Sequence, residues 1–291
     1  MNRFDFIKQV TIGTLSRITL NTWAKRIRDL PDTEQKMPVL FIGHGSPMNA
    51  IESNDFTQTL VNLGKNLPKP KAILCISAHW TTKGTYVNVS PSPKMIYDMY
   101  GFPNELYEVN YPARGAPEIA KEVPQLISTT KVQTNTEWGF DHGTWSILTH
   151  LFPKANVPVF QMSIDYNKSM QYHYDLSKQL MILRKKGVLI VGSGNLTHNL
   201  RIVDIDDINA TPRDWALEFD SKIKQYIDLR NHQAIINYEK IGAISKLAVP
   251  EPSHFFPLIY ALALQDKNDE TSYFYENFHY GTLSMRGVKI E

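Results

Sequence analysis

The sequence contains very little cysteine and no long apolar segment. Cys75 is the only cysteine among 291 residues, so no disulfide can form within the chain, and a zinc site built from several cysteines is excluded. The apolar run around it, AILCIS, predicts a small buried core residue. No stretch reaches the ~18 apolar residues that a membrane-spanning helix needs, so the sequence predicts no membrane span.

An excess of basic charge is also absent from most of the chain. Residues 1–36 hold 7 of the 31 Lys and Arg residues and 4 of the 29 Asp and Glu residues. Residues 37–291 therefore carry 24 basic and 25 acidic groups, a net charge of −1, and nothing there indicates a nucleic-acid partner. No repeat or Gly/Ser-rich linker divides this part. The sequence therefore predicts a leader over residues 1–36 and one domain over residues 37–291.

The leader resembles an export signal only in part. Its start, MNRFDFIKQV, is similar to a twin-arginine signal, but Phe4 stands where the second arginine belongs. The following segment is interrupted by Arg17 and has no A-x-A-like cleavage site. We therefore expect an amphipathic helix that packs on the rest of a cytoplasmic protein, with export through a degenerate signal as the alternative.

Short apolar runs alternate with helical patterns along the rest of the chain. Strands are predicted at 38–43, 71–78, 85–90, 157–164 and 187–194, with weaker strand patterns at 131–137 and 271–278. Helices are predicted at 54–67, 115–128, 144–152, 167–186, about 211–240 and 253–265, with Asn167 as an N-cap and Gly187 just past a helix end. This alternation predicts an α/β fold with a largely parallel central sheet flanked by helices, because strands buried on both faces read as continuous apolar runs.

Three of the nine histidines follow predicted strands. His44 follows the run PVLFIG, His79 follows AILCISA, and His198 follows VLIVGSGN. In open α/β sheets ligands bind at the carboxyl ends of the strands, so these side chains are expected at one edge of the sheet. His142, in WGFDHGTW after a weak strand, and His254, in EPSHFFPL at the start of an apolar helix, are further candidates. Neutral imidazole is the commonest protein ligand of metals, so the pattern indicates a histidine-rich metal site.

Five motifs, in their order along the chain, carry a resemblance to a known family. GHGSPMN, SAHW, GFDHGTW, GSGNLTHNL and PSHFFPL resemble the 4,5-DOPA extradiol dioxygenase family. This family is a branch of the class III extradiol ring-cleaving dioxygenases, to which the catalytic subunit of protocatechuate 4,5-dioxygenase belongs. The resemblance runs from about residue 37 to the C-terminus, through YGFPNELYEVNYPARG and GTLSMRGV. It implies a single α/β domain, over residues 37–291, that holds one non-haem Fe(II).

The resemblance also implies roles for the five histidines. His44, His79 and His254 resemble metal ligands. His198 matches a histidine that borders the metal and is either a further ligand or the catalytic acid–base. His142 resembles a histidine that contacts bound dioxygen or a substrate hydroxyl, and it would carry out proton transfer if His198 only binds the metal.

One position departs from the wider superfamily. There the third ligand is a glutamate, which gives the site of two histidines and one carboxylate found in many non-haem iron enzymes. Here His254 stands at that position, and Glu251, three residues earlier, has no matching motif. An all-histidine site would also bind Zn(II) well. Because zinc has no redox chemistry, Fe(II) is the expected working metal.

The implied reaction needs a base near the metal and room for an aromatic diol. A histidine suits proton transfer in both directions near neutral pH, and His198 is the first choice for this role. Asp141, next to His142, is expected either to orient an imidazole or to form a turn in FDHG. The expected partners are a small DOPA-like catechol and O2, and the product is a ring-opened muconic semialdehyde. The sequence indicates neither the physiological catechol nor an oligomeric state.

Two other classes of function compete with this interpretation. A zinc hydrolase would use three histidines to activate water, but it would need a nearby carboxylate base, and no HExxH element is present. The second class is a non-catalytic, metal-containing protein that binds partners, like the Memo type of the same superfamily. Retention of all five histidines favours catalysis over this second class.

Overall fold

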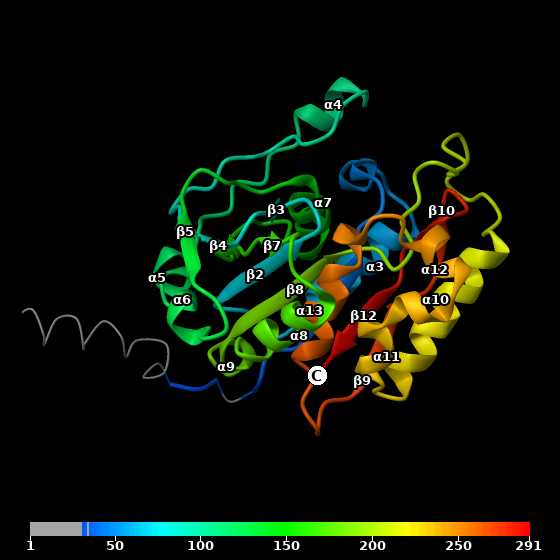
Figure 1. Cartoon of the computed structure of the whole chain (residues 1–291). Helices are drawn as coiled ribbons and strands as arrows, with labels where there is room; N and C mark the ends of the chain where they lie inside the picture. Colours follow the sequence, from blue (N-terminus) through cyan, green and yellow to red (C-terminus); the bar gives the residue numbers. More distant parts are fainter. Residues whose placement is uncertain (1–30, 34) are drawn as a thin grey trace, which may run out of the picture.

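A six-stranded sheet forms the centre of the computed structural model, which describes residues 31–33 and 35–291 (Figure 1). β6, β2, β8 and β1 run parallel, whereas β12 runs antiparallel to both of its neighbours. The predicted α/β fold with a largely parallel central sheet is confirmed. The strand order is β6 (Val159–Gln161), β2 (Ala72–Ser77), β8 (Val188–Gly194), β1 (Val39–Gly43), β12 (Gly287–Ile290) and β9 (Thr271–Tyr275).

Alternate residues of the central strands face two separate cores. Phe41 of β1 lies in one core and Ile42 lies in the other. Helices cover both faces of the sheet, which explains why these strands read as continuous apolar runs. The first core contains residues of α8 (Met170–Lys178) and α13 (Phe256–Ala263), and the second contains residues of α3 (Asp55–Asn66) and α7 (His142–Leu151).

The predicted helix over 115–128 is divided in two. The segment forms α5 (Pro117–Ala120) and α6 (Val123–Leu126). Pro124 has no N–H for a continuous helix, so it stands in the first turn of the second helix instead.

The predicted helix over 167–186 is also divided, into α8 and α9 (Met181–Lys185). The N-cap of α8 is Ser169, whose hydroxyl accepts a hydrogen bond from the helix backbone, rather than the expected Asn167. Gly187 lies just past α9 with a φ of +84°, as expected for a residue that ends a helix.

The remaining elements surround the central sheet. The predicted strands at 85–90 and 131–137 pair with each other outside that sheet, as β4 (Thr85–Asn88) and β5 (Val132–Asn135). Among the described residues, no helix is both long and apolar enough to cross a membrane. The other elements are η1 (Pro47–Ala50), β3 (Thr81–Thr82), α4 (Asn104–Tyr107), β7 (Ile164–Asp165), α10 (Asp214–Asp228), α11 (His232–Ile236), η2 (Tyr238–Ile241), α12 (Ala243–Ala248), η3 (Pro252–His254), β10 (Phe278–His279) and β11 (Leu283–Ser284).

The end of the leader is bound to the domain directly before β1. Lys36 forms ion pairs with Asp266 and Asp269, and the Met37 carbonyl accepts a hydrogen bond from the buried guanidinium of Arg184. The expected amphipathic helix falls within residues 1–30 and lies outside the described residues. The domain boundary near residue 36 stays a prediction.

Candidate metal centre

Three neighbouring parallel strands place three histidines at one edge of the sheet. The strands lie side by side in the order β2, β8 and β1. His44 is the first residue after β1, His79 is the second after β2, and His198 is the fourth after β8. Gly45 has a φ of +63°, a left-handed conformation that favours glycine, so the chain turns sharply after His44. The predicted position of these histidines past the carboxyl ends of their strands is confirmed.

His254 reaches the same edge from the short helix η3, which lies directly against β8. A Cβ atom on Gly194 would lie only 2.1 Å from the His254 carbonyl oxygen, so this approach requires glycine. The N–H of Asn195 donates a hydrogen bond to the same carbonyl at 2.9 Å. The contact between β8 and η3 therefore sets the position of His254.

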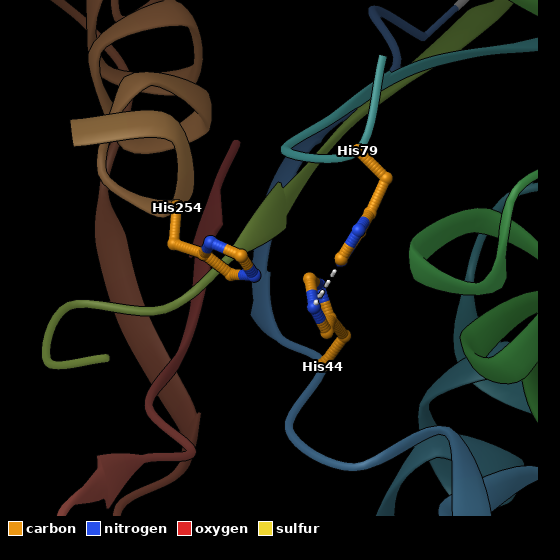
Figure 2. Close-up of side chains that lie close together, drawn as sticks. All are labelled: His44, His79 and His254. Atoms are coloured by element: carbon orange, nitrogen blue, oxygen red, sulfur yellow. Dashed lines mark hydrogen bonds between the residues drawn. The ribbon is translucent and has the colours of Figure 1, made fainter. Parts of the chain in front are cut away.

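The imidazoles of His44, His79 and His254 point toward one another (Figure 2). One ring nitrogen of each lies within 4.8 Å of those of the other two, and Nε2 of His79 is 3.2 Å from Nε2 of His44. Two nitrogen ligands at ~2.1 Å from one ion lie about 3.0 to 3.4 Å apart, depending on octahedral or tetrahedral geometry. The spacing therefore fits donors that share a single metal ion.

A buried serine orients the ring of His44. Nδ1 of His44 lies 2.9 Å from Oγ of Ser193, and that hydroxyl donates its hydrogen to the Gly143 carbonyl at 2.5 Å. Ser193 therefore accepts a hydrogen bond from His44. We assign the imidazole hydrogen to Nδ1, which leaves the lone pair on Nε2.

The other two rings are held in the same way. Nδ1 of His79 lies 3.1 Å from Oδ2 of Asp98, and Nδ1 of His254 lies 3.2 Å from Oγ of Ser253. The Ser253 hydroxyl donates to Glu251, so it accepts from His254. The Glu251 carboxylate thus supports His254 through Ser253 and is not part of the converging group. In all three histidines the lone pair is on Nε2.

The free Nε2 atoms make this site fit a cation. Nε2 of His254 is buried and has no hydrogen-bond partner among the described residues. The lone pairs of His44 and His79 face one another across 3.2 Å, where they repel unless a cation lies between them. Burial, and then the neighbouring imidazoles, lower the pKa of His44 and His254 well below the usual value. Both are therefore neutral, as metal ligands must be, and imidazole donors suit iron and zinc.

His198 lies against His254 rather than in the converging group. The two ring centroids are 3.5 Å apart and the ring planes differ by 6°. Among the described residues, two groups of ligand atoms lie within 4.8 Å of one another: His44, His79 and His254 form one, and His79, Asp98 and His142 form the other. His198 belongs to neither group. Burial lowers the pKa of His198 to about 3, which makes its imidazole neutral.

His142 is the first residue of α7, and the strand before it, β5, lies outside the central sheet. Its ring nevertheless joins the cluster, with a centroid 3.8 Å from that of His79 and 5.7 Å from that of His44. The start of a helix, not the end of a central strand, therefore brings His142 to the site.

Of the two roles expected for Asp141, orienting an imidazole or forming a local turn, the structure shows the local one. It is the N-cap of α7, and its side chain accepts a hydrogen bond from the N–H of Thr144. Its carboxylate also accepts hydrogen bonds from Ser77 at 2.6 Å and from Gln161 at 2.7 Å. These partners hold the start of α7 beside β2.

An aspartate that the sequence analysis did not single out contacts two of the histidines. Oδ2 of Asp98 lies 3.1 Å from Nδ1 of His79 and 3.1 Å from Nδ1 of His142. Burial acts to raise the pKa of Asp98, but hydrogen bonds from His142 and His79 outweigh it and hold the pKa of this carboxyl well below its usual range. Asp98 is the only acidic residue between Asp55 and Glu105, which is the one signal in the sequence that marks it.

Comparisons with known proteins agree with this geometry. The family model described as the catalytic LigB subunit of aromatic ring-opening dioxygenase matches residues 38–286. The chain is 37% identical over 270 residues to a 4,5-DOPA dioxygenase extradiol of Escherichia coli (strain K12), a match that covers 91% of this chain and 98% of that protein. It is 34% identical over 256 residues to a protein of the same name from Beta vulgaris, covering 86% and 95% of the two chains.

A solved structure shares the fold. The crystal structure of an uncharacterized protein from Escherichia coli K12 superposes with a TM-score of 0.77 and 35% sequence identity, covering 88% of this chain and 100% of that chain. Because the family model matches the chain from just before β1 to just before β12, the chain belongs to the catalytic LigB family and is an extradiol aromatic ring-opening dioxygenase.

Proposed function

We propose that the chain is an Fe(II)-dependent enzyme that opens the aromatic ring of a DOPA-like catechol, at a bond adjacent to the two hydroxyl-bearing carbons. Both atoms of O2 enter the product, a ring-opened muconic semialdehyde. The observation that carries this proposal is the convergence of one ring nitrogen each from His44, His79 and His254, with two more imidazoles beside them. The names of the relatives from Escherichia coli and Beta vulgaris support a DOPA-like substrate.

The metal in this proposal is Fe(II), held by His44, His79 and His254. When bound, it supplies the redox chemistry that allows dioxygen to react with an aromatic diol, which zinc cannot supply. A set of three protein ligands suits an oxygenase, because further coordination positions stay open. The oxygen atoms of Ser193, Asp98 and Ser253 keep the three Nε2 atoms directed at the metal.

Two histidines beside the ligands carry protons in this proposal. His198 stacks on His254 at the sheet edge, so its imidazole can take a proton from a substrate hydroxyl and return it when the ring opens. His142 lies beside His79, and its role is to hydrogen-bond the reacting oxygen atoms. His142 is buried and His198 is half-buried, so both rings are partly shielded from bulk water.

The test compares two metals and several diols. The purified full chain is loaded anaerobically with Fe(II), a second sample is loaded with Zn(II), and each is mixed with L-DOPA and oxygenated buffer. We expect oxygen uptake and a yellow ring-opened product from the iron sample alone, with two labelled oxygen atoms in the product when isotope-labelled O2 is used. Unsubstituted catechol and protocatechuate are tested in the same assay, for comparison with L-DOPA. Equal turnover with zinc, or no turnover of any diol with iron, would contradict the proposal.

A further inference from the structure

Asp98 lies on a largely irregular segment between β4 and α4, yet its position is well fixed. The N–H of Ile96 donates to the Phe140 carbonyl at 2.8 Å, and the indole N–H of Trp145 donates to the Ile96 carbonyl at 3.0 Å. Asp98 as a whole residue is exposed, but its side chain is only 19% exposed. The segment therefore lies at the surface but turns one carboxylate inward to the histidines.

The carboxylate of Asp98 faces one backbone N–H group and two imidazole nitrogens. Oδ1 accepts from the backbone N–H of His142 at 2.9 Å, and Oδ2 lies 3.1 Å from Nδ1 of His142 and of His79. An ionised carboxylate repels a ring-nitrogen lone pair at 3.1 Å, so both contacts favour the tautomer that carries its hydrogen on Nδ1. Both imidazoles are thereby restricted to one tautomer, which carries its lone pair on Nε2.

We propose that Asp98 is a positioning residue that fixes this tautomer in His79 and His142 together. The assignment of one ring to metal binding and the other to the reacting oxygen atoms rests on the proposed function. Asp98 contacts Nδ1 of each ring, and the lone pair that binds metal or the reacting oxygen is on the other nitrogen, Nε2. One carboxylate thus sets the tautomer of both His79 and His142, and its loss should affect both rings.

A purely structural role for Asp98 leads to a different expectation. Asp141 already caps α7 through the N–H of Thr144, so the start of this helix keeps a capping side chain without Asp98. If Asp98 only stabilised α7, its replacement would lower the free energy of unfolding but leave metal affinity and imidazole tautomers as they are. The two roles are therefore separable by experiment.

Asp98→Asn is the most direct variant. Its amide keeps an oxygen for the N–H of His142, but it places an NH2 donor where Oδ2 received Nδ1–H, so the hydrogen of His79 is driven toward Nε2. Loss of such a partner behind a ligating histidine typically lowers metal affinity by about 10- to 100-fold. Glu105→Gln is the matched control, because it removes one negative charge from exposed α4 without contact with the cluster.

The experiment measures Zn(II) affinity of the full chain by chelator competition, and nitrogen-15 NMR of the metal-free, histidine-labelled protein reports the tautomers. We expect Asp98→Asn to bind Zn(II) about 10- to 100-fold more weakly and to shift the signals of two histidines, while Glu105→Gln changes neither. If Asp98→Asn does not fold, Asp98→Ala takes its place with the same expected results. Unchanged affinity and unchanged histidine signals in a folded variant would overturn the proposal. Neither readout uses catechol turnover, so a failure of the proposed function is distinguishable from a failure of this inference.

Discussion

Replacement of His198 by alanine separates proton transfer from metal binding. The three converging Nε2 atoms and their oxygen partners belong to other residues, so His198→Ala should keep its iron. Removal of a general acid–base typically lowers the rate by about 10²- to 10⁴-fold. This loss corresponds to about 2.7 to 5.4 kcal/mol of transition-state stabilisation. We therefore expect a variant with normal metal content and almost no turnover.

The same change should cost the fold much less. The stack of His198 on His254 is worth about 0.5 to 1.5 kcal/mol by analogy with other ring pairs. The backbone N–H of His198 keeps its hydrogen bond to the Ala248 carbonyl at 2.8 Å, because alanine retains it. A fall in turnover that corresponds to much more than about 1.5 kcal/mol therefore reports a loss of proton transfer and not unfolding.

The assay measures iron content and oxygen-uptake rate with saturating L-DOPA on one sample of each protein. His232→Gln is the matched control, because His232 is a partly buried histidine that contacts Tyr174 and Gln265 outside the site. Loss of iron together with turnover would make His198 a required fourth ligand. Normal iron with undiminished turnover would refute both roles.

Three further predictions concern the metal, the leader and stability. His44→Ala or His79→Ala should abolish metal binding, because each removes one of three converging donors; full occupancy in both variants, by metal analysis, would exclude this site. A chain that begins at Met37 should keep iron-dependent activity, since the family match starts after that residue; a folded but inactive truncation would show that the leader completes the site. Burial lowers the pKa of His173 to about 4, so below about pH 6.5 the unfolded chain takes up a proton that the folded chain does not. Between about pH 6.5 and pH 4 the wild type should lose roughly 3 kcal/mol more unfolding free energy than His173→Gln in denaturant titrations, and equal losses would contradict this.

The sheet edge at which the histidines meet could be predicted because its signals are local. β1, β2 and β8 are buried on both faces, so each reads as an apolar run that stops shortly before its histidine. The parallel direction of such strands then brings their carboxyl ends together. The local sequence marked His254 as a candidate, but its role as a third ligand came from the resemblance, since its approach to β8 depends on a contact with Gly194 that no local pattern records.

The partners behind the histidines could not be predicted in this way. Asp98 lies 44 residues before His142 on a segment without periodicity, and its contact depends on how that segment runs beside the start of α7. Ser193 reads as one more buried residue of an apolar strand. β12 was also missed, because it is only four residues long and joins the sheet by an antiparallel pairing with β1 at the other end of the chain.

The contact between Gly194 and His254 has a consequence for how this enzyme can diversify. The chain leaves the sheet after β8, forms α10, α11 and α12, and returns at η3. Backbone hydrogen bonds from Asn195 to His254 and from His198 to Ala248 join the two ends of this excursion. Both histidines are therefore placed by the joined ends and not by the length of chain between them. Evolution or an engineer can lengthen or shorten the largely exposed loop at residues 200–207 to change the surface there, whereas one methyl group added at position 194 would displace His254.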